Sequence, residues 1–181
     1  MRNFFFALSL LLTACGYHVG DGTVASRYRT ISIPFVEGDI HGVMTDDLVR
    51  SISTRGCLSF VTCGGELALQ VCLLPPVSDN IGFRYAEENG SLTKITTAVE
   101  TRLTLTARVS LVDVRMGCTV IGPLEITAYQ TFDFDTDFST NNDHRFALGQ
   151  LEMYNQAEDI AFRPLYAKLA QKIVDAVCFG W

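Results

Sequence analysis

The longest regular pattern of hydrophobic and polar residues lies in the middle of the chain. Odd-numbered positions carry Ile95, Val99, Leu103, Leu105, Ala107, Val109 and Leu111, whereas even-numbered ones carry Glu100, Arg102, Thr104, Thr106, Arg108 and Ser110. Side chains that alternate with a period of two lie on opposite faces of a strand. Sheets with one buried and one wet face are typically antiparallel. The pattern predicts a long antiparallel strand with one face in water.

A second alternating segment follows a short turn. Met116-Gly117-Cys118 predicts the turn, and the alternation then continues through Val120, Leu124, Ile126, Ala128, Phe132 and Phe134. Gly122-Pro123 interrupts this segment and indicates a bulge or an edge position, since proline cannot donate to a strand ladder. The two segments, residues 95 to 134, should form one long hairpin.

Two shorter strands are expected on the N-terminal side of this hairpin. Residues 30 to 36 place Ile31, Ile33 and Phe35 on one face, and residues 67 to 73 alternate until Pro75-Pro76 ends the ladder. The segment from Ser78 to Ser91 is rich in Asn, Gly and Glu, which favours a loop.

Helical periodicity appears twice. From about Val43 to Arg55, the apolar residues Met44, Leu48 and Ile52 are four apart, and Gly56 is placed as a C-terminal stop. A longer helix is expected from about Arg145 to Cys178, with one apolar stripe formed by Phe162, Leu165, Leu169, Ile173 and Val177. Pro164 should kink this helix or start its second half.

The expected element order is strand, helix, strand, strand, strand, helix. Two helices laid on one face of a four-stranded, mostly antiparallel sheet would bury the apolar side of every strand. The sequence therefore predicts an α+β fold, a two-layer α/β sandwich of order βαβββα.

The first fourteen residues have the features of an export signal. Arg2 supplies a positive charge, residues 4 to 12 form an apolar run, and Leu12-Thr13-Ala14-Cys15 matches the lipoprotein cleavage pattern. We expect a signal peptide over residues 1–14, lipidation at Cys15, and a single domain over residues 15–181. An ordinary cleaved signal is the alternative. Gly16 stands where an aspartate would retain the lipoprotein in the inner membrane, so the outer membrane is the expected location.

Composition narrows the class of partner. Removing the signal with Arg2 leaves 13 Lys and Arg against 20 Asp and Glu, a formal charge of −7. This negative charge argues against a general nucleic-acid or anionic-lipid surface, although a local basic patch is compatible with that balance. No later segment approaches the ~20 apolar residues that a membrane-spanning helix needs.

Five cysteines remain besides Cys15, and an oxidising compartment permits disulfides among them. The odd number leaves at least one thiol unpaired or paired outside the chain. Cys57 and Cys63 flank a short turn and are the preferred pair. Cys72 and Cys178 are interpreted as small buried hydrophobes, and Cys118 is left unassigned.

Signals for catalysis or metal binding are weak. Asp133, Asp135 and Asp137 resemble a calcium loop, but Phe138 and His144 stand where that loop needs Gly and Glu. The cysteine spacings do not match a zinc site. The three histidines are scattered and suggest no nucleophile with its base. We expect no enzyme activity, no cofactor, no metal and no catalytic residue.

A family resemblance rests on short motifs and on element order. The lipobox followed by Cys15-Gly16-Tyr17-His18, then Ile31-Ser32-Ile33-Pro34-Phe35, a helix, three strands and a long helix, resembles the lipopolysaccharide-assembly (LptE-like) lipoproteins. This resemblance implies a non-catalytic outer-membrane lipoprotein that plugs and helps to assemble a lipopolysaccharide-exporting β-barrel (LptD-like). It also implies that the protein binds lipopolysaccharide in transit.

The resemblance further implies basic residues that meet the lipid A phosphates. The candidates are Arg84 and Lys94, near the loop before the long strand, and Arg102 and Arg108 on its wet face. Solvated surface charges without a role are the alternative for each of them. Two other functions stay open: a periplasmic ligand-binding or enzymatic lipoprotein, and an assembly (pilot) factor for a different outer-membrane barrel.

Overall fold

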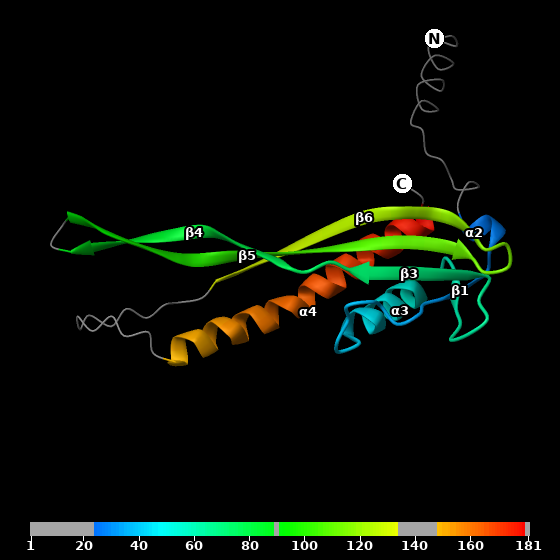
Figure 1. Cartoon of the computed structure of the whole chain (residues 1–181), viewed down its shortest axis with the longest axis horizontal. Helices are drawn as coiled ribbons and strands as arrows, with labels where there is room; N and C mark the ends of the chain where they lie inside the picture. The colour runs from blue at the N-terminus through cyan, green and yellow to red at the C-terminus, as the bar shows by residue number, and fades with distance from the viewer. Residues whose placement is uncertain (1–23, 89–90, 134–147, 180–181) are drawn as a thin grey trace, which may run out of the picture.

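A computed structural model describes residues 24–88, 91–133 and 148–179, with the side chains of 84–99 and 148–153 outside the description. The elements in chain order are α2 (Val24–Arg27), β1 (Thr30–Ser32), α3 (Val43–Arg55), β2 (Ser59–Phe60), β3 (Leu67–Leu73), β4 (Val77–Glu88), β5 (Ser91–Asp113), β6 (Cys118–Asp133) and α4 (Leu148–Phe179). Helices and one sheet form separate layers (Figure 1). The expected α+β class is confirmed.

Strand β5 is the spine of a six-stranded sheet. Strand β6 pairs along one of its edges, while β3 and β4 follow one another along the other edge, with Leu73 opposite Ala107 and Val77 opposite Thr104. These three pairings are antiparallel, and β1 adds to β3 and β2 to β1 in parallel. The sheet is mostly antiparallel, as expected, but has six strands where the sequence predicts four.

The alternation in β5 decides which face is buried. The odd-numbered side chains Leu103, Leu105, Ala107, Val109 and Leu111 are buried, and they belong to one core with residues of α3 and α4. Figure 1 shows both helices on the same side of the sheet. The predicted hairpin with one covered face is confirmed.

Helix α3 has the predicted bounds, and its ends explain why. Met44, Leu48 and Ile52 are fully buried, and Gly56 adopts a left-handed conformation whose N–H donates to the Ile52 carbonyl. Before the helix, the buried Asp39 carboxylate accepts hydrogen bonds from the Thr45 N–H at 2.8 Å and from the Thr45 hydroxyl at 2.9 Å. A carboxylate at this end also complements the positive end of the helix dipole.

The bulge expected at Gly122-Pro123 is present in β6. The pairing register between β5 and β6 shifts next to it, between Val109 and Leu111. Gly122 has φ of 94°, and an added Cβ would collide with the Val109 carbonyl oxygen, so only glycine fits there.

Two predictions about strands are wrong. Most of the segment predicted as a loop, residues 78 to 91, is strand β4 and the start of β5, because Val77, Ile81, Phe83 and Tyr85 alternate between the polar residues. Phe35 is 67% exposed rather than buried with Ile31 and Ile33. Strand β1 ends at Ser32, and Pro34 lacks the N–H that would continue it.

Helix α4 begins at Leu148, and residues 145–147 lie outside the described part. Leu165, Leu169, Ile173 and Val177 are buried as predicted, and Phe162 is half-buried. Pro164 lies inside one helix rather than between two. Its missing N–H removes one hydrogen bond from an exposed turn. The signal peptide and Cys15 also fall outside the described residues.

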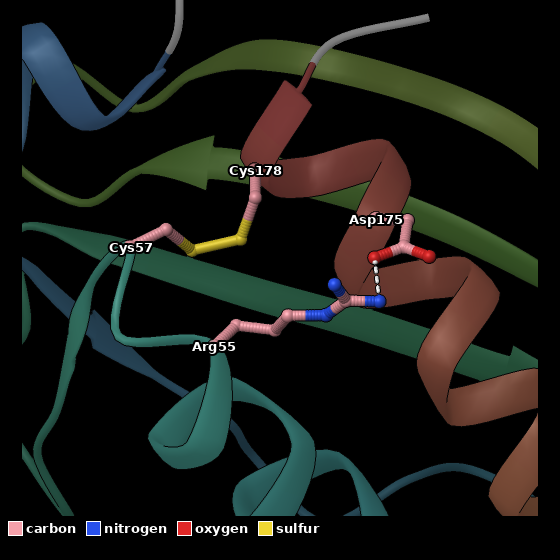
Figure 2. Close-up of a disulfide and its surroundings, with 4 residues drawn as sticks. All are labelled: Arg55, Cys57, Asp175 and Cys178. Carbon is pink, nitrogen blue, oxygen red and sulfur yellow. Dashed lines mark ion pairs between the residues drawn. A yellow bond between two sulfur atoms is a disulfide. The ribbon is translucent and has the colours of Figure 1, made fainter.

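The predicted Cys57–Cys63 disulfide is wrong. Cys57 pairs with Cys178 across 121 residues, with the Cα atoms 6.0 Å apart, and Cys63 is free and exposed. Figure 2 shows the bond joining the segment just after α3 to the last turn of α4, next to an ion pair between Arg55 and Asp175, whose atoms are 2.6 Å apart. Cys178 is buried, as interpreted, but as half of a disulfide. Cys72 is a half-buried free thiol.

Candidate partner-binding face of the sheet

The face of the sheet opposite the helices is polar and open. We call it the open face and define it by side chains of β3, β5 and β6: Gln70, Cys72, Arg102, Thr104, Thr106, Arg108, Ser110, Glu125, Thr127 and Tyr129. None of them is buried, and within the described residues the helices α3 and α4 pack on the other side. A broad surface of hydroxyl groups and charges is therefore presented to solvent.

Cross-strand pairs hold the side chains of the open face in place. The hydroxyl groups of Thr106 and Thr127 are 2.9 Å apart in a hydrogen bond. Arg108 donates to Glu125 over 3.0 Å on the neighbouring rung of the ladder. Pairs of this kind stabilise the sheet and order its surface before any partner arrives.

The two open-face arginines differ in their surroundings. The Arg102 guanidinium lies 5.2 Å from the centre of the Tyr129 ring, and no described carboxylate lies within ion-pair distance of it. Arg108 is already neutralised by Glu125. A guanidinium held over an aromatic ring keeps its N–H donors free for an anion. Arg102 is therefore better placed than Arg108 to bind a phosphate.

The four candidate basic residues are not all brought together. Arg102 and Arg108 share the open face, six residues apart, which is about 20 Å along a strand. Arg84 lies opposite Thr97 in the β4–β5 ribbon, and Lys94 lies in β5 farther along it. The side chains of Arg84 and Lys94 are outside the described part, so their role stays a prediction.

A hollow of about 350 Å³ interrupts the open face beside β3. Its floor is the sheet and its wall is the chain before α3; the lining residues are Pro34, Phe35, Glu37, Gln70, Val71, Cys72, Arg108 and Ser110. Backbone hydrogen bonds from Glu37 to Val71 and from Leu73 to Glu37 fix this wall. The alternating pattern predicts a buried Phe35, so it did not indicate that Phe35 lines this hollow.

The thiol in the hollow is not an activated nucleophile. Burial raises the pKa of Cys72, and the nearby Glu37 carboxylate raises it further. A thiol with a raised pKa stays protonated near neutral pH, and the thiolate is the reactive form. The hollow therefore has the character of a contact surface rather than of a catalytic centre.

Other candidate chemistry finds little support in the described part of the chain. No cluster of His, Cys, Asp and Glu suited to a metal ion occurs there. Asp133 is exposed at the end of β6 and His41 lies exposed before α3, whereas Asp135, Asp137, His18 and His144 fall outside the description. No described helix combines the length and apolarity needed to cross a bilayer.

The fold is similar to those of solved lipoproteins. A minor lipoprotein from Acinetobacter baumannii matches with a TM-score of 0.51 and 18% identity, over 84% of this chain and 92% of that one. An uncharacterized lipoprotein B from Nitrosomonas europaea matches with a TM-score of 0.52 and 16% identity, over 83% of each chain. Identities this low support the fold alone. No curated protein matches the chain.

The family of the chain is shown by the match to a family model. The model of the LptE family, described as lipopolysaccharide-assembly, matches residues 28–177, which span every element from β1 to α4. The family is one of non-enzymatic lipoproteins. The chain belongs to the LptE family of lipopolysaccharide-assembly lipoproteins.

Proposed function

We propose that the protein is an outer-membrane lipoprotein, anchored through Cys15, that plugs and helps to assemble the β-barrel exporting lipopolysaccharide. Family membership associates the chain with the lipopolysaccharide transport machinery, and the barrel partner is our further step. The export signal before Cys15 supports the anchored location. The Cys57–Cys178 disulfide agrees with an oxidising compartment.

The proposal is supported chiefly by the polar, ordered open face, which no helix of the described residues covers. The lumen of an outer-membrane barrel is polar, and its wall alternates polar and apolar side chains. Threonine hydroxyls both donate and accept hydrogen bonds, so Thr104, Thr106 and Thr127 can satisfy a polar wall in many orientations. A sandwich with an apolar open face could not enter such a lumen without burying unpaired groups of the wall.

The open face also supports a contact with lipopolysaccharide. The phosphates of lipid A are anions that guanidinium groups bind in a charge-assisted manner. Arg102 has the free donors for such a contact, and the backbones of Arg84 in β4 and Lys94 in β5 lie farther along the β4–β5 ribbon. We propose Arg102 as the main phosphate contact among the described residues, with Arg108 secondary.

The hollow bears on the alternative of a periplasmic ligand carrier. Carriers enclose their ligand in a cavity lined mainly by apolar side chains. This hollow is open to solvent on the open face rather than enclosed, and its lining mixes Pro34, Phe35, Val71 and Cys72 with the polar or charged groups of Glu37, Gln70, Arg108 and Ser110. It is therefore better suited to receive a protruding side chain of a partner. No described feature favours the pilot factor over the barrel plug.

Co-purification tests the proposal. The tagged, lipidated protein is extracted in mild detergent, and a barrel should accompany it in a one-to-one complex. The variant Thr106→Glu with Thr127→Glu places two like charges side by side on the open face and should abolish the complex. Gln171→Glu with Gln156→Glu, at exposed positions of α4, is the matched control and should retain it. Recovery of the free lipoprotein alone, from membranes that contain the barrel, would contradict the proposal.

A further inference from the structure

One end of the molecule exposes apolar side chains on a rigid turn. The turn between β5 and β6 holds Val114, 52% exposed, and Met116, 78% exposed. The Asp113 carboxylate accepts hydrogen bonds from the backbone N–H groups of Arg115 and Met116, at 2.8 and 2.9 Å. These bonds fix the turn, so its two apolar side chains are held outward.

Exposed arginines surround this turn. The Arg115 side chain is 80% exposed, and its ion-pair contact with Glu66 is a long one of 4.0 Å. Arg27 and Arg29 are exposed at the end of α2 and just beyond it. The backbone N–H of Arg29 donates to the same Glu66 carboxylate, which brings this segment beside the turn. Three arginines thus gather at one end of a chain whose net charge is −6.

The same end is the one nearest to the predicted anchor. The Tyr28 hydroxyl donates to Asp113 at 2.9 Å, so the segment after α2 is fastened to the turn. Helix α2 starts at Val24, nine residues after Cys15. Nine residues span at most about 30 Å when fully extended. A lipid on Cys15 therefore keeps this end close to the bilayer.

We propose that Arg27, Arg29, Val114, Arg115 and Met116 form an anchor-end surface that rests on the phospholipid leaflet carrying the lipidated cysteine. The arginines meet lipid phosphates, while the two apolar side chains enter the interface. Apolar groups flanked by cations bind membrane interfaces in this way, and one acyl tether is commonly supplemented by a basic patch. The contact sets the tilt of the sheet relative to the bilayer. This inference rests on the lipidation that the proposed function includes.

Fluorescence quenching tests the contact directly. Met116→Trp is introduced with Trp181→Phe, so that the lipidated protein carries one tryptophan, and the protein is reconstituted in phosphatidylethanolamine and phosphatidylglycerol vesicles. Brominated acyl chains should quench this tryptophan. Ile160→Trp in the same background is the matched control, because Ile160 is exposed on α4 away from the turn, and it should not be quenched. Equal quenching of the two, or none at position 116, would overturn the proposal.

The arginines are tested by binding of the mature chain without its lipid. A chain that starts at residue 16, and so lacks both the signal and the lipid, should bind phosphatidylglycerol vesicles, and each arginine changed to Gln should weaken that binding about fivefold. Unchanged binding after replacement of all three would overturn the proposal.

Flotation of the lipidated protein with vesicles separates this inference from the proposed function. A floating protein that shows no quenching at position 116 refutes the anchor-end surface alone. A protein that does not float refutes the lipid anchor and the surface with it. If the tryptophan at position 116 is shielded from water only when the barrel is present, this end contacts a protein partner and the proposal is overturned.

Discussion

The two faces of β5 differ although they alternate residue by residue. Leu103, Leu105 and Ala107 are buried against the helices, whereas Arg102 and Thr106 lie on the open face. The buried face ties the sheet to α3 and α4, and the open face is ordered by cross-strand pairs without being covered by any described element. One strand can therefore carry stability and recognition on alternate residues. Substitutions on the two faces should have separable effects.

The largest effect on stability is expected from loss of the Cys57–Cys178 disulfide, which joins the segment after α3 to α4. Replacing Cys57 and Cys178 by Ser releases a 121-residue loop, and the free energy of unfolding should fall by about 4 kcal/mol. Urea unfolding of the oxidised protein and the double variant measures the difference. Cys63→Ser removes an exposed free thiol and is the control, which should unfold like the parent. Equal loss in both variants would contradict the structural role of this disulfide.

A cavity on the covered face of the sheet should lower the free energy of unfolding somewhat less than loss of the disulfide does. Leu103 is fully buried, and Leu103→Ala should lower the free energy of unfolding by about 3 kcal/mol. The neighbouring Thr104→Ala, on the open face, should change it by about 0.5 kcal/mol or less. Urea denaturation of both variants checks the contrast. If the two substitutions were equally destabilising, the open face would not be free.

Acid should loosen the turn at the end of β5. The pKa of Asp113 lies below its ordinary value of 3.8, because its carboxylate accepts hydrogen bonds from the Met116 N–H, the Tyr28 hydroxyl and the Arg115 N–H. A carboxyl group with a lowered pKa in the folded state contributes stability above the unfolded pKa. That stability is lost as pH falls from about 4 through the folded pKa. Asp113→Asn should therefore lower the Tm at pH 6 and flatten its decline in acid.

Melting curves between pH 3 and 7 test this prediction. Asp79→Asn provides a control, because Asp79 is an exposed carboxyl group on β4 with no hydrogen bond to the turn. An Asp113→Asn variant whose Tm declines in acid as steeply as that of the parent would show that another group controls the acid response.

The smallest effect on stability is expected at Arg102. Arg102→Gln removes only a cation–π contact with Tyr129, so the free energy of unfolding should change by about 0.5 kcal/mol. Binding of lipopolysaccharide by the purified protein should nevertheless weaken about tenfold, because a charge-assisted contact to phosphate is lost. Arg108→Gln should weaken binding less, since Glu125 already pairs with Arg108. Equal binding by the parent and both variants would remove the arginines from the phosphate site.

The parts of the fold that could be predicted from the sequence are those with local signals. Alternation specified the covered face of β5, and Gly56 marked the end of α3. Strand β4 is not indicated as clearly, because Asp79 occupies one of its odd-numbered positions and Gly82 weakens the strand signal. The Asn89-Gly90 dipeptide, a typical hairpin turn sequence, was the signal that could have revealed this strand.

The remaining features depend on distant parts of the chain. Cys57 and Cys178 meet only because α3 packs on α4, so no spacing in the sequence indicates their bond. The difference between Arg102 and Arg108 depends on which residues of β6 lie near them, Tyr129 and Glu125 respectively, and the bulge at Gly122 helps to set that register. The sequence therefore indicated the open face, but not which of its arginines is free.

Site-specific photo-crosslinking in cells can show which side of the protein contacts the barrel. A photoreactive phenylalanine analogue replaces Thr106 on the open face or, in a second strain, Gln171 on the outer side of α4. We expect a strong crosslink from position 106 to an outer-membrane β-barrel and a weaker one from position 171. No crosslink from position 106, with a strong one from position 171, would place the partner on the helices and rule out the open face as the binding surface.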